Sequence, residues 1–148
     1  MTAARFTDEQ VRRYSRQILL VDVGGRGQAR LLAAEVAIDI GGAAGRIAAL
    51  LLGAAGVGRI VLCGALDRVV TDEDVGFPLT AGDRGRALGD AMAAHVIARN
   101  GDVTVARATS APAGSLQLGD DPSLASALAR AGEAASAIAY RLATGATP

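Results

Sequence analysis

The sequence predicts an α/β fold, a Rossmann-like three-layer sandwich with a mainly parallel sheet and short amino-terminal helices. Three observations support this prediction. Residues 35–40 and 59–63 are nearly unbroken apolar runs, as expected for strands buried in a parallel sheet. Stretches with a helical pattern, 42–55 and 86–100, alternate with these runs. A glycine-rich turn joins the first strand to its helix, and this alternation is typical of parallel sheets.

Two helices are expected before the first strand. Residues 7–20 open with Thr7 as an N-cap and with acids in the first turn, and both features favour a helix start. Gly24, Gly25 and Gly27 then interrupt the chain, so we expect the second helix to be short, at 28–34.

The sheet is completed by a third strand. We expect mostly loop over 64–84, where glycines and a proline recur. The helix at 86–100 leads into a short strand at 103–106, and an edge strand is expected around Leu116.

The closing helix has clear end signals. Asp121 can cap it, Pro122 suits its first turn and Gly145 can end it. We find no internal repeat and no linker, so the whole chain, 1–148, is expected to form one domain. Its expected parts are an amino-terminal helical arm, a nucleotide-binding-like core, and a loop with the closing helix, at 1–34, 35–107 and 108–148.

Composition excludes several classes of protein. The 148 residues have a net charge of zero, which argues against a general nucleic-acid binder. The one cysteine, Cys63, excludes an internal disulfide and a cysteine-based zinc site, and we expect no metal site. No apolar run reaches the roughly 18 residues of a membrane span, and the amino terminus is too polar for a signal peptide. We therefore expect a cytoplasmic protein without membrane or nucleic-acid partners.

The glycine turn has part of a dinucleotide-binding pattern. In G-x-G-x-x-G, the first glycine permits a tight turn, the second lets the pyrophosphate approach, and the third lets helix and strand pack closely. Gly42 and Gly45 can fill the second and third places. Ile40 stands in the first place, and Gly41 follows it one residue late.

An acid at the end of the second strand normally accepts hydrogen bonds from the ribose. Gly64 or Ala65 occupies that position, and the nearest acid is Asp67. Three extended residues span about 10 Å, so Asp67 reaches the ribose only if the loop bulges back. Two interpretations stay open. Either the glycines only let the helix pack tightly, or a nucleotide site is formed by Gly41, Gly42, Gly45, Arg46 and Asp67.

Longer segments of the chain form a more specific pattern. They are Arg13-Tyr14-Ser15-Arg16-Gln17, the glycine turn, Ala55-Gly56-Val57-Gly58 and Asn100-Gly101-Asp102-Val103. From about residue 10 to residue 105 the chain resembles the ThiF/MoeB/HesA family, the bacterial relatives of ubiquitin-activating enzymes.

The resemblance implies a domain that binds ATP and Mg²⁺ and adenylates the carboxyl-terminal glycine of a ubiquitin-like or sulfur-carrier protein. It also implies a dimer. The second arginine of the opening motif, Arg16, is then the candidate to reach the ATP phosphates of the partner subunit, with Arg13 as the other candidate.

The chain also departs from the family. Gly64 replaces the ribose acid, and Leu88 replaces a phosphate-binding Lys or Arg, although Arg84 and Arg86 are near. About half of the family's usual catalytic domain is missing, with its metal-holding aspartate, zinc-binding cysteine pairs and catalytic cysteine. Loss of one charged contact in such a site costs two or three orders of magnitude in rate. We therefore expect no catalytic residue, and we expect the implied ATP and Mg²⁺ to be poorly held.

The first functional hypothesis is a truncated, catalytically impaired relative, a pseudoenzyme of the adenylyltransferase type. It forms a homodimer, or a heterodimer with a full-length relative, and acts as a partner or scaffold for activation of a carrier protein or peptide. One alternative is an active minimal ATP-dependent adenylyltransferase, in which Asp67 replaces the lost acid. The other is a peptide-binding module in peptide-modification biosynthesis, which uses an exposed sheet edge or the vacated carrier channel.

Overall fold

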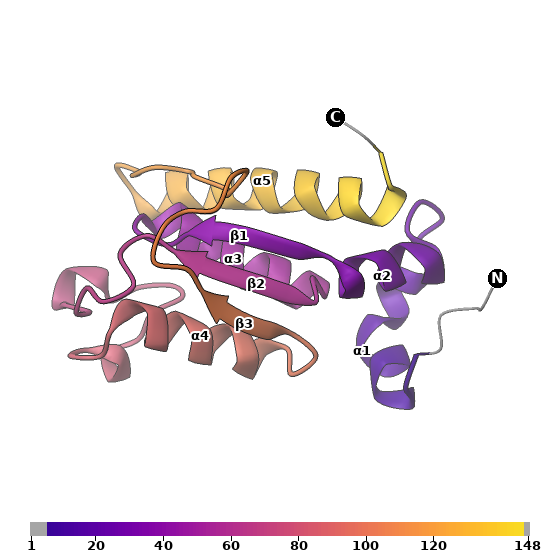
Figure 1. The fold of residues 1–148 in the computed structure, drawn as a ribbon, viewed down its shortest axis with the longest axis horizontal. Helices are drawn as coiled ribbons and strands as arrows, with labels where there is room; N and C mark the ends of the chain where they lie inside the picture. The colour runs from indigo at the N-terminus through magenta and orange to yellow at the C-terminus, as the bar shows by residue number, and fades with distance from the viewer. Residues whose placement is uncertain (1–5, 147–148) are drawn as a thin grey trace.

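A three-stranded parallel sheet forms the centre of the computed structural model, which describes residues 6–146 (Figure 1). The strands β1 (Glu35–Asp39), β2 (Arg59–Cys63) and β3 (Thr104–Arg107) lie side by side in this order, and both pairs are parallel. The predicted α/β class and parallel Rossmann-like sheet are confirmed. The outermost residues of the expected arm and closing segment, 1–5 and 147–148, lie outside the described residues.

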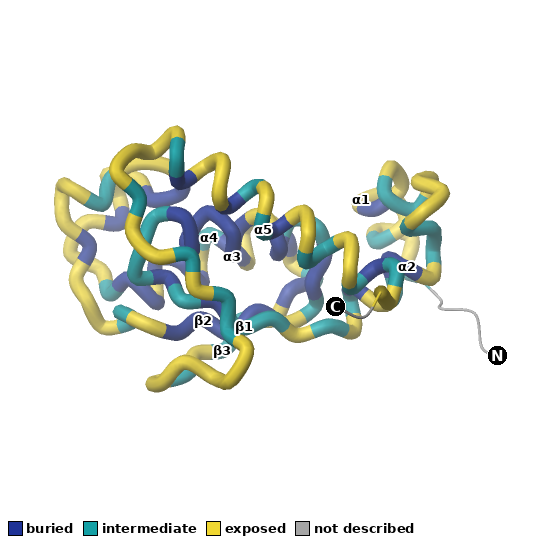
Figure 2. Tube along the Cα trace, turned by 90° about the horizontal axis from the view of Figure 1, so that it is seen from above, coloured by how far each residue is buried: buried dark blue, intermediate teal, exposed yellow. Residues whose placement is uncertain are grey.

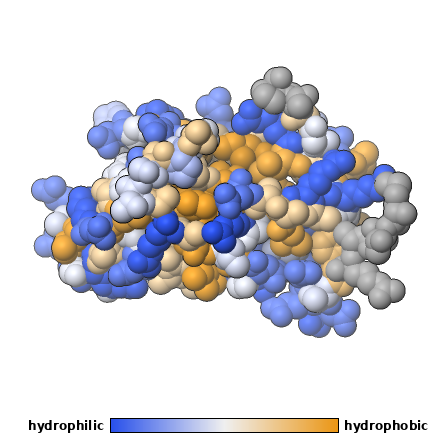
Figure 3. All heavy atoms as spheres, viewed as in Figure 1, coloured by the Kyte–Doolittle hydropathy of each residue, from blue (hydrophilic) through white to orange (hydrophobic). Residues whose placement is uncertain are grey.

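All three helices that pack on the core lie on one face of the sheet. Helix α3 (Ala43–Ala55) connects β1 to β2, α4 (Leu88–Arg99) connects β2 to β3, and α5 (Leu124–Thr144) packs along α3 (Figures 1 and 2). Within residues 6–146 no helix covers the opposite face, on which Figure 3 shows apolar and polar atoms intermixed. The predicted three layers are thus corrected to two. Crossovers between strands added in one direction place their helices on the same face, and a second helical layer requires the strand order to reverse.

After β3 the chain returns to the far edge of the sheet. Leu116 forms a single parallel bridge with Ile38 of β1. Its N–H donates to the Ala37 carbonyl at 2.8 Å, and its own carbonyl accepts from the Asp39 N–H at 2.9 Å. The edge strand predicted around Leu116 is therefore present as one bridging residue.

Two further helices, α1 (Asp8–Ile18) and α2 (Gly24–Ala33), form an arm at one end of the core (Figure 1). Thr7 caps α1 as predicted, because its hydroxyl accepts from the Gln10 N–H at 3.2 Å. The predicted break before Gln28 is wrong, since α2 already starts at Gly24. Tertiary contact favours glycine in this helix, since a Cβ at Gly27 would lie only 3.0 Å from the Ala143 carbonyl oxygen of α5.

The carboxyl-terminal helix α5 begins with a cap that differs from the predicted one. Ser123 is the N-cap, and its hydroxyl accepts from the Ser126 N–H at 3.2 Å. The predicted cap, Asp121, instead accepts from the Ser126 hydroxyl and from Arg130, each at 3.0 Å. Gly145 ends the helix in the left-handed conformation, as predicted.

Helix α3 rests directly on the backbone of β1. A Cβ atom built at Gly45 would lie 1.9 Å from the Asp39 carbonyl oxygen, a distance that no side chain tolerates. Gly45 therefore fills the third glycine role of the nucleotide-binding turn, which is close packing of helix on strand.

We expect Gly45→Ala to lower the free energy of unfolding by about 3 kcal/mol, because the added methyl group forces the helix away from the strand. Gly132→Ala is the matched control on α5. A Cβ there meets nothing within 4 Å, so this variant should gain about 0.5 kcal/mol from helix propensity. Urea unfolding followed by circular dichroism measures both variants. A Gly45→Ala variant as stable as the parent would contradict the contact.

Candidate functional site

A pocket of about 340 Å³ lies at the carboxyl end of β1, where open parallel α/β sheets bind their ligands. We call it the glycine-turn pocket. It is lined by residues of the turn after β1 and of the loop before α5, namely Asp39, Gly41, Gly42, Gln117, Gly119 and Asp120.

The structure brings together only part of the predicted nucleotide site. Gly41 and Gly42 line the pocket. Gly45 faces β1 instead, and the Arg46 side chain is buried beneath the turn. Asp67 is exposed in the turn that follows β2 and is not among the residues that line the pocket.

Oxygen atoms of the protein stand against the start of α3. A Cβ built at Gly42, the N-cap, would lie 2.4 Å from the Gly119 carbonyl oxygen and 3.3 Å from a carboxylate oxygen of Asp120. On the other side, the Asp39 carboxylate accepts from the Gly41 N–H at 2.8 Å. The start of a helix attracts anions through its free N–H groups and its dipole. Here acceptors of the chain itself already lie beside it.

Asp39 also occupies the region of the missing ribose acid. Gly64 follows β2 with a positive φ of 88°, and a Cβ there would lie 2.4 Å from the Asp39 carboxylate. An acid at position 64 would thus project into space that Asp39 fills from the neighbouring strand. Sequence reasoning missed Asp39. The available signal was an acid at the last position of an apolar strand, directly before the turn.

The neighbouring thiol of Cys63 has low reactivity. Cys63 pairs with Asp39 in the register of the two strands and is fully buried. Burial raises the pKa of the thiol, and the negative charge of Asp39 raises it further. The thiol therefore stays protonated near neutral pH and is a poor nucleophile.

The buried guanidinium of Arg46 is directed into the protein. It donates to the Gly41 carbonyl at 3.1 Å and lies 3.8 Å from the Asp74 carboxylate. Burial lowers the pKa of Arg46, and the charge of Asp74 opposes that effect. Arg68 holds the same carboxylate with two hydrogen bonds of 2.7 and 2.8 Å, which keep the pKa of Asp74 well below its usual range. Arg46 thus supports the turn from below.

The residues of the pocket do not fit a triphosphate in this arrangement. A triphosphate needs N–H donors and cations, whereas a carbonyl and two carboxylates, from Gly119, Asp39 and Asp120, lie beside the start of α3. Residues 6–146 also contain no group of three or more His, Cys, Asp or Glu side chains placed to hold a metal ion.

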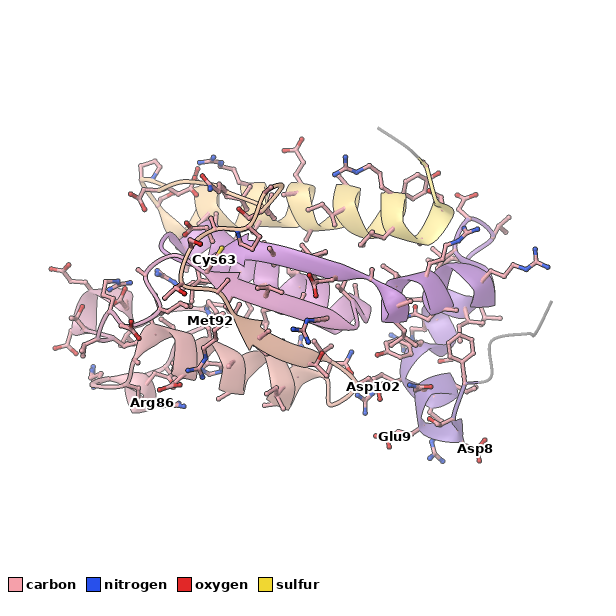
Figure 4. All side chains as sticks on the ribbon, in the orientation of Figure 1. Asp8, Glu9, Cys63, Arg86, Met92 and Asp102 are labelled. Carbon is pink, nitrogen blue, oxygen red and sulfur yellow. The ribbon has the colours of Figure 1, made fainter. Side chains whose placement is uncertain are left out.

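The two candidate trans-acting arginines lie on α1 in different surroundings. Arg13 donates to the Asn100 side chain at 2.5 Å and pairs with Glu9 at 2.6 Å and Asp102 at 3.5 Å. Figure 4 shows Asp102 at the end of the core that faces α1, and Glu9 on that helix. Arg16 is exposed in the last turn of α1. Both arginines are exposed, and Arg13 is the one already paired with acids of this chain.

A hydrogen-bond network joins the arm to the core. The buried Tyr14 hydroxyl accepts from the Asn100 amide at 2.8 Å and donates to Asp102 at 3.1 Å. The same amide also donates to the Gly53 carbonyl of α3 at 2.9 Å. Two of the family-like segments, those around Tyr14 and around Asn100, therefore meet in space to hold the arm.

Comparison with known proteins supports the family resemblance. The chain is 41% identical over 96 residues to a sulfur carrier protein adenylyltransferase of Thermus thermophilus, a match that covers 57% of the chain and 35% of that protein. It is 48% identical over 59 residues to the adenylyltransferase and sulfurtransferase MOCS3 of Bos taurus, covering 40% and 13%. The matches thus span about a third or less of these relatives. No family model matches the chain.

Solved structures share the fold. PaaA superposes over the full chain with a TM-score of 0.82 at 17% identity, and the match covers 70% of PaaA. Escherichia coli MccB in complex with MccA-N7isoASN has a TM-score of 0.59 at 20% identity, covering 68% of this chain and 31% of that one. Likeness at such identities shows the fold alone. Together with the adenylyltransferases matched in sequence, it confirms the resemblance to the ThiF/MoeB/HesA family.

The helices of the described part of the chain are all too short or too polar to cross a membrane.

We expect Asp74→Asn to lower the free energy of unfolding at pH 7 by about 2 kcal/mol, because charge-assisted hydrogen bonds to Arg68 are lost. A carboxylate whose pKa is lower in the folded protein stabilises it fully above its unfolded pKa of about 4, and the stabilisation is lost as the pH falls further. The variant should therefore lose less stability than the parent between pH 4 and pH 2.

Chemical denaturation at several pH values measures this difference. The control is Glu73→Gln, a change of the exposed neighbouring acid, which should follow the parent at every pH. An Asp74→Asn variant with the parent's full acid sensitivity would show that Asp74 is not the group responsible.

Proposed function

We propose that this chain is a catalytically impaired relative of the ThiF/MoeB/HesA adenylyltransferases that acts by association. It serves as a partner or scaffold in the activation of a carrier protein or peptide, and it holds ATP and Mg²⁺ weakly or not at all. The observation that supports this most strongly is the set of acceptor oxygens, from Asp39, Gly119 and Asp120, beside the start of α3.

At the start of α3, the helix dipole attracts a phosphate and the nearby carboxylates repel it, so the sizes of these two energies must be compared. A helix dipole stabilises an anion at its start by about 0.3–2 kcal/mol. Two like unit charges 4 Å apart repel by about 4 kcal/mol at an effective dielectric constant of 20. Two carboxylates, Asp39 and Asp120, line the same pocket. At that separation a carboxylate repels a phosphate more strongly than the helix attracts it. Arg46, turned toward the Gly41 carbonyl and Asp74, does not offset this repulsion.

The arm offers a surface for association. The turn between α1 and α2 exposes three consecutive apolar side chains, with Leu19 81% and Val21 100% accessible and Leu20 half-exposed. Exposed apolar groups of this kind mark protein interaction sites when they cluster. Arg16 lies on the adjoining helix and is also exposed, so a partner that covers the turn would meet it. The partner is a second copy or a full-length relative.

We expect Val21→Asp to weaken association at least tenfold, because it places a charge in the apolar contact. Val69→Asp, at another exposed valine far along the chain, is the matched control and should associate like the parent. Analytical ultracentrifugation measures self-association. Co-purification from the native cell, followed by a pyrophosphate-exchange assay of the captured adenylyltransferase, measures the effect on a partner. A monomeric chain that leaves the exchange rate of every such partner unchanged would refute the proposal.

One observation favours a second candidate, an active minimal adenylyltransferase. The Asp39 carboxylate lies where an acid at position 64 would project, and it could accept hydrogen bonds from a ribose. This candidate requires ATP to bind, and it requires Asp39→Ala to weaken that binding.

A further inference from the structure

A groove of about 680 Å³ runs along the outer edge of β1 and meets the glycine-turn pocket at Gln117, which lines both. Its floor is formed by Glu35, Val36 and Ala37. One wall is the loop 112–117, and the other is α5, which contributes Ile138 and Arg141. The volume lies within the usual range of ligand sites, about 300–1,000 Å³.

The floor of the groove presents backbone groups that a strand could pair with. The backbone N–H and carbonyl groups of alternate residues along β1 point toward β2. At the two ends of this series, the Ile40 N–H donates to the Cys63 carbonyl and the Ala34 carbonyl accepts from the Arg59 N–H. The backbone groups of the residues between them point toward the outer edge of the sheet. There Leu116 forms hydrogen bonds with the Asp39 N–H and the Ala37 carbonyl and with no other group of β1. Within residues 6–146, the N–H of Ala37 and the carbonyl of Glu35 have no hydrogen-bond partner. Such an edge is a template for another strand.

The charge of the groove is set by Arg141. This side chain is exposed in the last turn of α5 and forms no ion pair within the described residues. The acid of the groove, Glu35, is already paired with Arg59 at 2.7 Å. The groove therefore complements a negative group at its α5 wall.

We propose that this groove binds an extended peptide, which continues the line of Leu116 along the free edge of β1 and places a carboxylate at Arg141. Backbone hydrogen bonds to Ala37 and Glu35 supply affinity, and alternate side chains of the peptide rest on Ile138 or point outward. Pairing with the Glu35 carbonyl and the Ala37 N–H is parallel, as it is for Leu116. Because Arg141 lies near the amino end of β1, beside Glu35, the carboxylate is that of an acidic side chain near the amino end of the peptide. This inference extends the proposed scaffold role, but its test involves neither nucleotide nor partner protein, so the two can fail separately.

The test uses the full chain and three fluorescein-labelled hexapeptides, followed by fluorescence anisotropy. The peptides are ETVTVT, QTVTVT and TVTVTE, each acetylated at its amino terminus and labelled at its carboxyl end. We expect saturable one-to-one binding of the first peptide and at least tenfold weaker binding of the other two, which lack a carboxylate at the end that meets Arg141. The amide of Ala37 should exchange hydrogen more slowly when the peptide is bound.

Two variants test the residues of the groove. Arg141→Glu should weaken binding at least tenfold, whereas Arg99→Glu, in the last turn of α4, should change it less than twofold. Ala37→Pro should abolish binding because it removes the N–H, and proline is tolerated where an N–H faces the open edge of a sheet. If that variant does not fold, the two arginine variants decide. Absence of saturable binding, or equal affinity in Arg141→Glu and the parent, would overturn the inference.

Discussion

The contact between α3 and the end of β1 fixes the geometry of the candidate site. Because Gly45 has no side chain, the helix rests on the Asp39 carbonyl oxygen. This places the start of α3 beside the Asp39 carboxylate and beside Gly119 and Asp120 of the returning loop. The same close packing positions a phosphate in nucleotide-binding folds. In this chain the close packing of helix on strand is present, while the groups beside the start of the helix are hydrogen-bond acceptors.

The segments that most resemble the family form contacts that hold the arm on the core. Tyr14 is buried against Gly56, where a Cβ would lie 2.8 Å from the tyrosine ring, and its hydroxyl meets Asn100 and Asp102. An active enzyme and an inactive relative need these contacts equally, since both must hold the arm on the core. The presence of these motifs therefore indicates the fold but does not distinguish an active enzyme from an inactive relative. Catalysis depends on the charges around the glycine turn.

Local patterns predicted most elements of the fold, and long-range contacts account for what they missed. The limits of β2 follow from an apolar run that ends at Cys63, and Gly145 ends α5 because left-handed backbone favours glycine. Ser123 and Asp121 are both good caps, so the sequence alone could not choose between them. Asp120 carries no local signal, since it joins the pocket only through the folding of an irregular loop against Gly42. The single helical layer is likewise a property of strand order.

Calorimetric titration of the chain with ATP and with adenosine, each in the presence of Mg²⁺, tests the central claim most directly. The comparison isolates the triphosphate, because adenosine shares every other group of the nucleotide. If acceptor oxygens and two carboxylates face the start of α3, ATP should bind no more tightly than adenosine, even at millimolar concentration. Saturable binding of ATP at least tenfold tighter than that of adenosine would contradict the account, since it would show that the glycine turn still holds phosphate.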